Sequence, residues 1–281
     1  MILVAGGTGR LGTVLVRQLV IDGQPTRVLT RDPRRAAHLT GVELAVGDVR
    51  DPASLAPAMS GVRTVVSAVH GFLGPGRVTP ASVDRDGNAN LITAAAATGA
   101  HVVLMSVLGA SADHPMELFR MKAAAEHLLR RSGLPWTIVR AGAFLELYQQ
   151  LLQRAARRSG RPVIFGRGDN PITFTAVADV AAAIRRAITD PDCRATTLEV
   201  AGPTLTFNQL AATMTDVLGP GAAAPRHLPR PLLRLLASAG STTPARQATA
   251  ALIMDTHPLT HPISRSAAEP APAPATGKNR S

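Results

Sequence analysis

The chain has 281 residues, of which 46% are hydrophobic, enough for one large or two modest domains around a substantial core. Its net charge of +11 suits phosphate-bearing ligands, anionic surfaces or nucleic acid, or else belongs to solvated helix faces. Because only 3% of the residues are aromatic and no long basic block occurs, specific nucleic-acid binding is not expected. Cys193 is the only cysteine, which excludes an intramolecular disulfide. No window contains about 18 uninterrupted apolar residues, so no membrane span is expected. With no signal peptide apparent, we expect a cytoplasmic protein.

Short apolar runs alternate with longer helical patterns through the first 140 residues. The predicted strands are Ile2–Ala5, Arg27–Thr30, Val42–Val46, Thr64–Ala68, His101–Met105 and Trp136–Val139. The predicted helices between them are Arg10–Ile21, Ala53–Met59, Val83–Thr98 and Met116–Arg131. Because the strands lack polar alternation, both faces of the sheet should be covered by helices, as in a parallel α/β fold.

This alternation becomes less regular after residue 140. The predicted helices are Phe144–Arg158, Val177–Thr189, Phe207–Leu218, Pro229–Ala239 and Pro244–Met254, and the predicted strands are Val163–Phe165 and Thr197–Val200. The stretch FGRGDNPITF predicts a hairpin or loop over a cleft. We expect a domain of residues 1–140, a smaller lobe of residues 141–263 interleaved with the sheet, and a disordered Pro/Ala/Ser-rich tail, residues 264–281.

A glycine-rich stretch joins the first strand to the first helix in the order GGTGRLG. Its spacing is Gly6-x-x-Gly9-x-x-Gly12, and the frame that starts at Gly7 also matches the dinucleotide-binding fingerprint. Such glycines permit a tight turn, a close approach of a pyrophosphate to backbone N–H groups, and close packing of the helix on the sheet. A tight turn without a ligand is the alternative. The expected cofactor-binding loop is Gly6, Gly7, Thr8, Gly9, Arg10, Leu11 and Gly12.

The end of the second strand indicates which dinucleotide is bound. An NAD site usually has a carboxylate there for the ribose 2′-hydroxyl, whereas this chain has Thr30 and Arg31, followed by Arg35. A guanidinium at that position favours a 2′-phosphate, so we expect NADP(H), with NAD(H) as the second possibility. Asp32 would repel the phosphate if it turned inward, but we expect it to form a salt bridge or to cap the next turn.

The third and fourth strands end in further candidate contacts. Asp48 can accept from an adenine amino group with Val49 against the ring, although a turn or cap role is equally consistent with its position. Ala68 and Val69 are small enough for the backbone to pass under a dinucleotide. His70 follows as a candidate substrate contact, or else as an exposed loop histidine.

These motifs together resemble the atypical short-chain dehydrogenases/reductases of the NmrA-like, NAD(P)-binding group over about residues 1–220. The resemblance rests on GGTGRLG, RDP, GDVRDPASL, the long stretches around Asn88 and Lys122, FTAVADVAAAI and LEVAGP. It implies a doubly wound Rossmann sheet with a small α+β C-terminal lobe and a substrate site between them. Some members of the group reduce quinones or enones, and others bind the dinucleotide without turning over a substrate.

The resemblance also implies catalytic positions, and here the chain departs from the pattern. Ser106 and Lys122 match the family serine and lysine, but Leu118 stands four residues before the lysine, where a tyrosine is usual. The only tyrosine is Tyr148. Lys122 can then hold the ribose or donate a proton, or else it pairs with Glu126 on the helix surface. Ser106 can bind substrate or cofactor, or end the strand.

Two further features concern the cleft and a metal. Arg140 ends the sixth strand and either lines the cleft or pairs with Asp179. His114, Glu117 and His127 do not form a metal site, and none is expected.

The sequence therefore predicts an NADPH-dependent oxidoreductase acting on a small apolar quinone, enone or carbonyl. The alternative is a non-catalytic NADP(H)-binding sensor that acts through a regulatory protein partner. The sequence does not define an oligomeric state.

Overall fold

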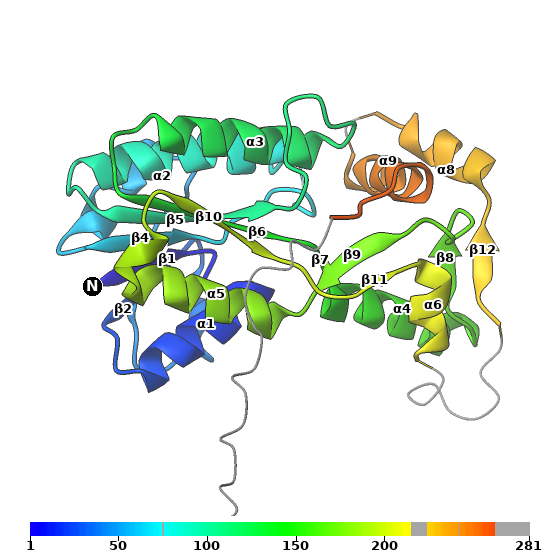
Figure 1. The fold of residues 1–281 in the computed structure, drawn as a ribbon, viewed down its shortest axis with the longest axis horizontal. Helices are drawn as coiled ribbons and strands as arrows, with labels where there is room; N and C mark the ends of the chain where they lie inside the picture. Colours follow the sequence, from blue (N-terminus) through cyan, green and yellow to red (C-terminus); the bar gives the residue numbers. More distant parts are fainter. Residues whose placement is uncertain (75, 215–223, 241, 262–281) are drawn as a thin grey trace, which may run out of the picture.

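A seven-stranded parallel sheet forms the centre of the computed structural model, which describes residues 1–74, 76–214, 224–240 and 242–261 (Figure 1). The strand order is β10-β6-β5-β4-β1-β2-β3, and every neighbouring pair is parallel. The strands are β1 (Ile2–Ala5), β2 (Thr26–Thr30), β3 (Glu43–Val46), β4 (Thr64–Ser67), β5 (His101–Val107), β6 (Trp136–Ala141) and β10 (Thr196–Val200). The order reverses direction between β1 and β4, which is where doubly wound sheets bind their ligands. The predicted Rossmann-type α/β fold is confirmed.

Helices cover both faces of this sheet (Figure 1). Helices α1 (Arg10–Ile21) and α5 (Val177–Thr189) pack together on one face, and α2 (Asp86–Ala96) and α3 (Glu117–Arg130) cover the other. Apolar side chains at helical spacing make each contact: Leu15 and Ile184 are fully buried on the first face, and Leu91 and Leu129 on the second. Burial of each such side chain stabilises the fold by about 1.5–3 kcal/mol.

A smaller lobe lies beyond the carboxyl ends of the strands (Figure 1). Its sheet pairs β11 (Thr204–Leu205), β9 (Ile172–Thr175) and β7 (Ala143–Phe144), and a second pair joins β12 (Arg226–Leu228) to β8 (Val163–Phe165). Its helices are α4 (Leu145–Ser159), α6 (Phe207–Ala212), α8 (Arg230–Ala237) and α9 (Thr243–Thr256). Phe174 is fully buried at its centre, against Tyr148 and Phe207. Helix α5 and strand β10 follow the first elements of this lobe in the chain but pack on the large sheet. The expected division of the chain at residue 140 stays a prediction.

Several predicted elements differ from those observed. The segment predicted as a helix over Ala53–Met59 forms two short 3₁₀ turns, Pro52–Ser54 and Pro57–Met59, because each proline starts a turn and cannot continue an earlier one. The helix predicted from Val83 begins instead as a π-helix, Pro80–Arg85. The segment 165–174 was expected to be a hairpin or a loop, and it is a loop, since β8 pairs with β12 while β9 pairs with β7 and β11.

Other predictions extend past the described residues. Helix α6 ends at Ala212, and residues 215–223 and the predicted tail, 264–281, lie outside the described part of the chain. Among the described helices, none combines the length and the apolar character that crossing a membrane requires.

Candidate dinucleotide-binding and reductase site

The glycine turn between β1 and α1 is built by close contacts between backbone segments. Gly6 has φ +86°, and the Gly9 N–H donates to its carbonyl at 3.0 Å. A Cβ atom on Gly6 would lie 2.5 Å from the Ala68 carbonyl oxygen, and one on Gly12 would collide with the Gly6 carbonyl oxygen. Only glycine fits at these two positions, so the turn, the helix and the end of β4 share one closely packed site.

The N-terminus of α1 favours a bound anion. Gly9 is the N-cap residue and has no side chain to cap the helix, and the first turn holds no acidic residue. Arg10 instead begins the helix, so a cation lies at the positive end of the helix dipole, where an anion would be stabilising. This uncapped, glycine-lined turn fits the pyrophosphate of a dinucleotide.

The remaining loop residues contribute differently. The Arg10 guanidinium donates to Gln150 Oε1 of α4 at 2.7 Å, which ties the loop to the smaller lobe. Leu11 is buried in the core, so only its backbone can face a ligand. Gly7 is buried against Val28 of β2, and Thr8 is half-buried.

Exposed cations follow the second strand. Asp32 accepts from the Arg34 backbone N–H at 3.1 Å and pairs with its guanidinium at 3.1 Å, which confirms the expected cap and salt bridge. Arg31 and Arg35 are exposed and form no ion pair with any described residue. Both guanidinium groups therefore remain available for an anion such as a ribose phosphate.

The third strand ends in a carboxylate that is already paired. Asp48 lies 2.6 Å from the Arg50 guanidinium, whose hydrogen bond lowers the pKa of the carboxyl, and the charge of Arg31 acts in the same direction. Val49 is buried against Gly87 of α2 and offers a ligand little surface. The adenine contacts of Asp48 and Val49 stay a prediction.

Lys122 forms a buried ion pair beneath the fourth strand. Its Nζ lies 2.9 Å from Asp84 Oδ1 and donates to the carbonyl oxygens of Val69 and Met105, both at 3.0 Å. The ammonium thus has two hydrogen-bond acceptors and one ion-pair partner, and the residue is 3% exposed. The alternative of a surface pair with Glu126 is wrong, because Lys122 faces the sheet and not solvent. The role of Lys122 in ribose binding or proton donation stays a prediction.

Asp84 was not identified as a site residue from the sequence. The π-helix positions it with no exposed surface, and its Oδ2 accepts the Gly71 N–H at 2.8 Å. Asn88, one turn later, donates to the Asp84 carbonyl at 2.7 Å and accepts from Ser67 Oγ at 2.5 Å. In the sequence, Asp84 and Asn88 stand among other polar residues in the segment VDRDGNAN, so no local pattern distinguishes them.

Ser106 belongs to a second buried polar cluster. Its Oγ donates to Glu126 Oε1 at 2.5 Å, and Arg140 lies 2.7 Å from Glu126 Oε2. Burial alone would raise the pKa of Glu126, but hydrogen bonds from Arg140 and Ser106 outweigh it and lower the pKa. The alternative pairing of Arg140 with Asp179 is wrong, since Asp179 is exposed on α5. A substrate or cofactor contact of Ser106 stays a prediction.

The position of the missing tyrosine forms part of an apolar surface. Leu118 is half-buried and packs with Phe72, Phe119 and Leu145 against the core of the smaller lobe. Tyr148 lies in the same cluster, donates to Met254 Sδ at 3.4 Å, and has its pKa raised to about 12 by burial. Tyr148 is therefore a poor replacement as an acid.

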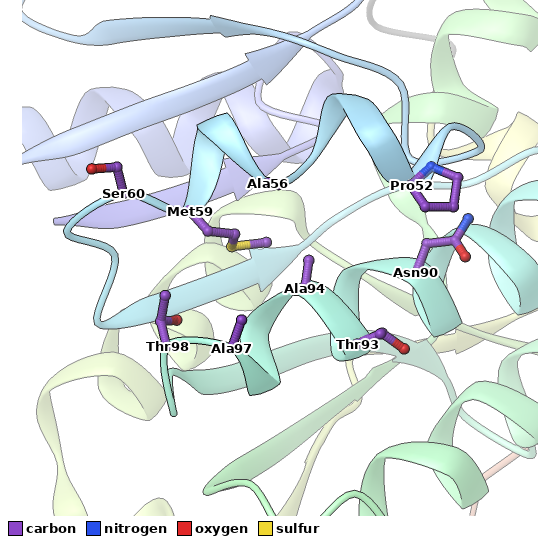
Figure 2. Close-up of a pocket in the computed structure, with 9 residues that line it drawn as sticks. All are labelled: Pro52, Ala56, Met59, Ser60, Asn90, Thr93, Ala94, Ala97 and Thr98. Carbon is purple, nitrogen blue, oxygen red and sulfur yellow. The ribbon is translucent and has the colours of Figure 1, made fainter.

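A separate groove of about 460 Å³ lies between the 3₁₀ turns and α2 (Figure 2). Its lining residues are Pro52, Ala56, Met59, Ser60, Asn90, Thr93, Ala94, Ala97 and Thr98. None of the predicted site residues lines it, so the candidate site is defined by the residues at the β1–β4 junction and not by this groove. Over the described residues, no group of His, Cys, Asp and Glu side chains could hold a metal ion.

The parallel sheet, the glycine turn and the uncapped helix N-terminus define a dinucleotide-binding protein. The chain belongs to the NAD(P)H-binding family, whose model matches residues 6–191. The resemblance to the atypical short-chain dehydrogenases/reductases of the NmrA-like group is thereby confirmed.

Three similar proteins indicate the range of functions within this family. The NAD(P)H azoreductase of Xenophilus azovorans is 33% identical over 224 residues, which cover 78% of this chain and 74% of that protein. The photosystem II assembly factor Ycf39 of Cyanophora paradoxa is 36% identical over 152 residues, covering 52% and 46%. The NADPH-dependent quinone oxidoreductase of Escherichia coli, in complex with NADPH, superposes with a TM-score of 0.74 at 26% identity, covering 93% of this chain and 91% of that chain.

Proposed function

We propose that the chain is an NADPH-dependent reductase of a small apolar acceptor, such as a quinone, an enone or a carbonyl. The observation that carries this proposal is the segment after β4, which leads from one surface to another: Ala68 lies against Gly6, and Phe72, four residues later, packs in the same cluster as Leu118. One is the polar glycine turn that fits a pyrophosphate, and the other is the apolar surface around Leu118 and Phe72. An apolar surface with few polar groups suits an acceptor that is itself planar and apolar.

The exposed arginines after β2 favour NADPH over NADH. Arg31 and Arg35 form no ion pair with the described residues, while Asp32 is paired with Arg34. A charge-assisted hydrogen bond to a 2′-phosphate contributes about 1.5–3 kcal/mol, or roughly a ten- to hundredfold preference.

The chain's own residues bind and orient in this proposal. When bound, the reduced dinucleotide supplies a hydride. The glycine turn holds the pyrophosphate, Arg31 holds the ribose phosphate, and the apolar surface keeps water from the acceptor. Quinone reduction needs little further help, because a hydroquinone can take its protons from water.

One relative is an azoreductase and one structural neighbour is a quinone oxidoreductase, which supports a reductase. A second candidate is a non-catalytic NADP(H)-responsive protein, favoured by Leu118 in place of tyrosine and by Lys122, which is buried, ion-paired and bound to two backbone carbonyls. The relative described as an assembly factor is consistent with it.

Consumption of NADPH separates the two candidates. The purified chain is first titrated with NADPH and NADH to obtain both dissociation constants, and NADPH absorbance is then followed with a panel of quinones and enones. Turnover supports the reductase. Binding of NADPH without consumption, with every acceptor tested, supports the NADP(H)-responsive protein.

A further inference from the structure

The buried ion pair holds the backbone on both sides of His70. Lys122 Nζ donates to the carbonyl oxygen of Val69, and Asp84 Oδ2 accepts the N–H of Gly71. The two charged groups lie 2.9 Å apart, and Asp84 has no exposed surface. Each half of the ion pair therefore binds one of the two peptide segments that flank His70.

The neighbouring residues restrict this segment further. A Cβ atom on Gly71 would collide with the Thr79 carbonyl oxygen, just before the π-helix that carries Asp84. On the other side, Ala68 donates its N–H to Ala5 at 2.9 Å and lies against the glycine turn at Gly6. The segment is thus fixed at both ends, while the His70 side chain remains exposed.

This position is at the edge where the ligand is expected. His70 lies three residues beyond the end of β4, beside β1 at the reversal of strand order. The other candidate acids are occupied: Lys122 is ion-paired with Asp84 and donates to two carbonyls, Ser106 donates to Glu126, and Tyr148 donates to Met254. Of these four side chains, only that of His70 is exposed.

We propose that His70 is the proton donor to the reduced acceptor, and that Asp84 and Lys122 are positioning residues that hold it there. This rests on the proposed reductase function. The acceptor gains a hydride from NADPH, and its developing anion then takes a proton from the His70 imidazolium. One imidazolium N–H bond breaks, one O–H, N–H or C–H bond forms on the product, and solvent reprotonates the neutral imidazole.

Partial burial of the ring and two neighbouring charges shift the pKa of His70. Desolvation lowers the pKa of His70 below 6.5, Asp84 acts to raise it, and Lys122 acts to lower it. The protonated fraction of His70 should therefore be small above pH 6.5 and should rise as the pH falls through the pKa of the ring. A reductase that uses His70 as its acid should lose kcat/KM as the pH rises through the pKa of His70.

The first test compares His70→Gln with the control His127→Gln, which changes an exposed histidine of α3. We expect His70→Gln to lower kcat/KM at least tenfold for an enone, to flatten its pH profile, and to leave the NADPH dissociation constant within twofold. The loss should be smaller for a quinone, because the reduced quinone is less basic. External imidazole should restore part of the activity of His70→Ala. Unchanged kcat/KM and pH profile in His70→Gln would overturn the proposal.

The second test needs neither NADPH nor turnover. NMR titration of the His70 ring in the cofactor-free protein should give a higher pKa in Lys122→Met and a lower pKa in Asp84→Asn than in the unaltered chain. The double variant Asp84→Asn/Lys122→Met removes both charges, so neither is left buried without a partner. It should therefore stay folded even where a single variant unfolds. If none of these variants changes the pKa of His70, the ion pair of Asp84 and Lys122 does not position His70, and the proposal is contradicted. Absence of NADPH consumption by the unaltered chain would instead refute the reductase, so the two failures are distinguishable.

Discussion

Lys122 Nζ lies 2.9 Å from Asp84 Oδ1, and this pair links α3 to the π-helix beneath the end of β4. Both side chains are buried, and each also binds the backbone of the segment Val69–Gly71. A buried ion pair is costly to disrupt from one side, because the remaining charge loses its partner without regaining water. The pair therefore joins the stability of the fold to the geometry of the candidate site.

Removing one member of this pair should strongly destabilise the protein. Lys122→Met leaves the Asp84 carboxylate buried without a cation, which costs about 3–5 kcal/mol. Urea unfolding followed by circular dichroism measures the change. Asp84→Asn/Lys122→Met should lose less than Lys122→Met alone, since neither charge then remains buried. Equal losses in the two variants would show that the ion pair does not contribute in this way.

Gly12→Ala should weaken NADPH binding. The new Cβ atom would collide with the Gly6 carbonyl oxygen and lie 2.6 Å from Gly7 Cα, so the helix and the turn must separate. Overpacking of this kind costs about 1–3 kcal/mol, and we expect at least a tenfold weaker dissociation constant, measured by NADPH fluorescence. Gly23→Ala is the control for the backbone strain of replacing a glycine: its φ of +67° strains an alanine, but nothing lies within 4 Å of its Cβ position and it is remote from the turn, so NADPH binding should not change. Unaltered binding by Gly12→Ala would contradict the assignment of the loop.

Arg31→Ala should reduce the preference for NADPH. Loss of a guanidinium beside the 2′-phosphate is expected to weaken NADPH roughly ten- to hundredfold, at about 1.5–3 kcal/mol, and to leave NADH nearly unchanged. Arg17→Ala removes an equally exposed cation from α1 and controls for net charge. Equal losses for both dinucleotides, or no loss at all, would argue against a phosphate contact at Arg31.

His101 should make stability depend on pH. Burial, followed by the charge of Arg194, lowers its pKa from 6.5 to about 4. As the pH falls below 6.5 the unfolded chain binds the extra proton first, so stability is complete above about 6.5 and is lost progressively down to about 4. The loss is on the order of 3 kcal/mol, at 1.36 kcal/mol per pKa unit.

Urea unfolding of the unaltered chain and of His101→Gln, at pH 4.5 and pH 7, measures this contribution. The variant should lose less stability between the two pH values than the unaltered chain does. A pH dependence that is the same in both proteins would show that His101 is not the group responsible.

The local patterns of the first half of the chain were sufficient to predict the large sheet. Unalternating apolar runs such as Ile2–Ala5 are buried on both faces, and the glycine spacing has few structural explanations besides a phosphate turn. Two strands of the smaller lobe were missed, because Ala143–Phe144 and Thr204–Leu205 are two residues long and carry no periodicity, whereas the strand Val163–Phe165 was predicted.

The polar partners of the site could not be predicted for a different reason. Helical spacing pairs Lys122 with Glu126, but both face the buried side of α3, where tertiary partners are stronger than a solvated i, i+4 contact. Asp84 lies in the π-helix that positions it beside Lys122, and no local pattern in the sequence predicts a π-helix there.

Hydride transfer from NADPH to an apolar acceptor can be followed directly. The measurement uses NADPH deuterated at C4, on each face in turn, with an enone acceptor and mass spectrometry of the reduced product. We predict that deuterium from one face only appears on carbon in the product, at the rate at which NADPH is consumed. NADPH that binds tightly but is not consumed, or a reduced product without deuterium from either face, would contradict it.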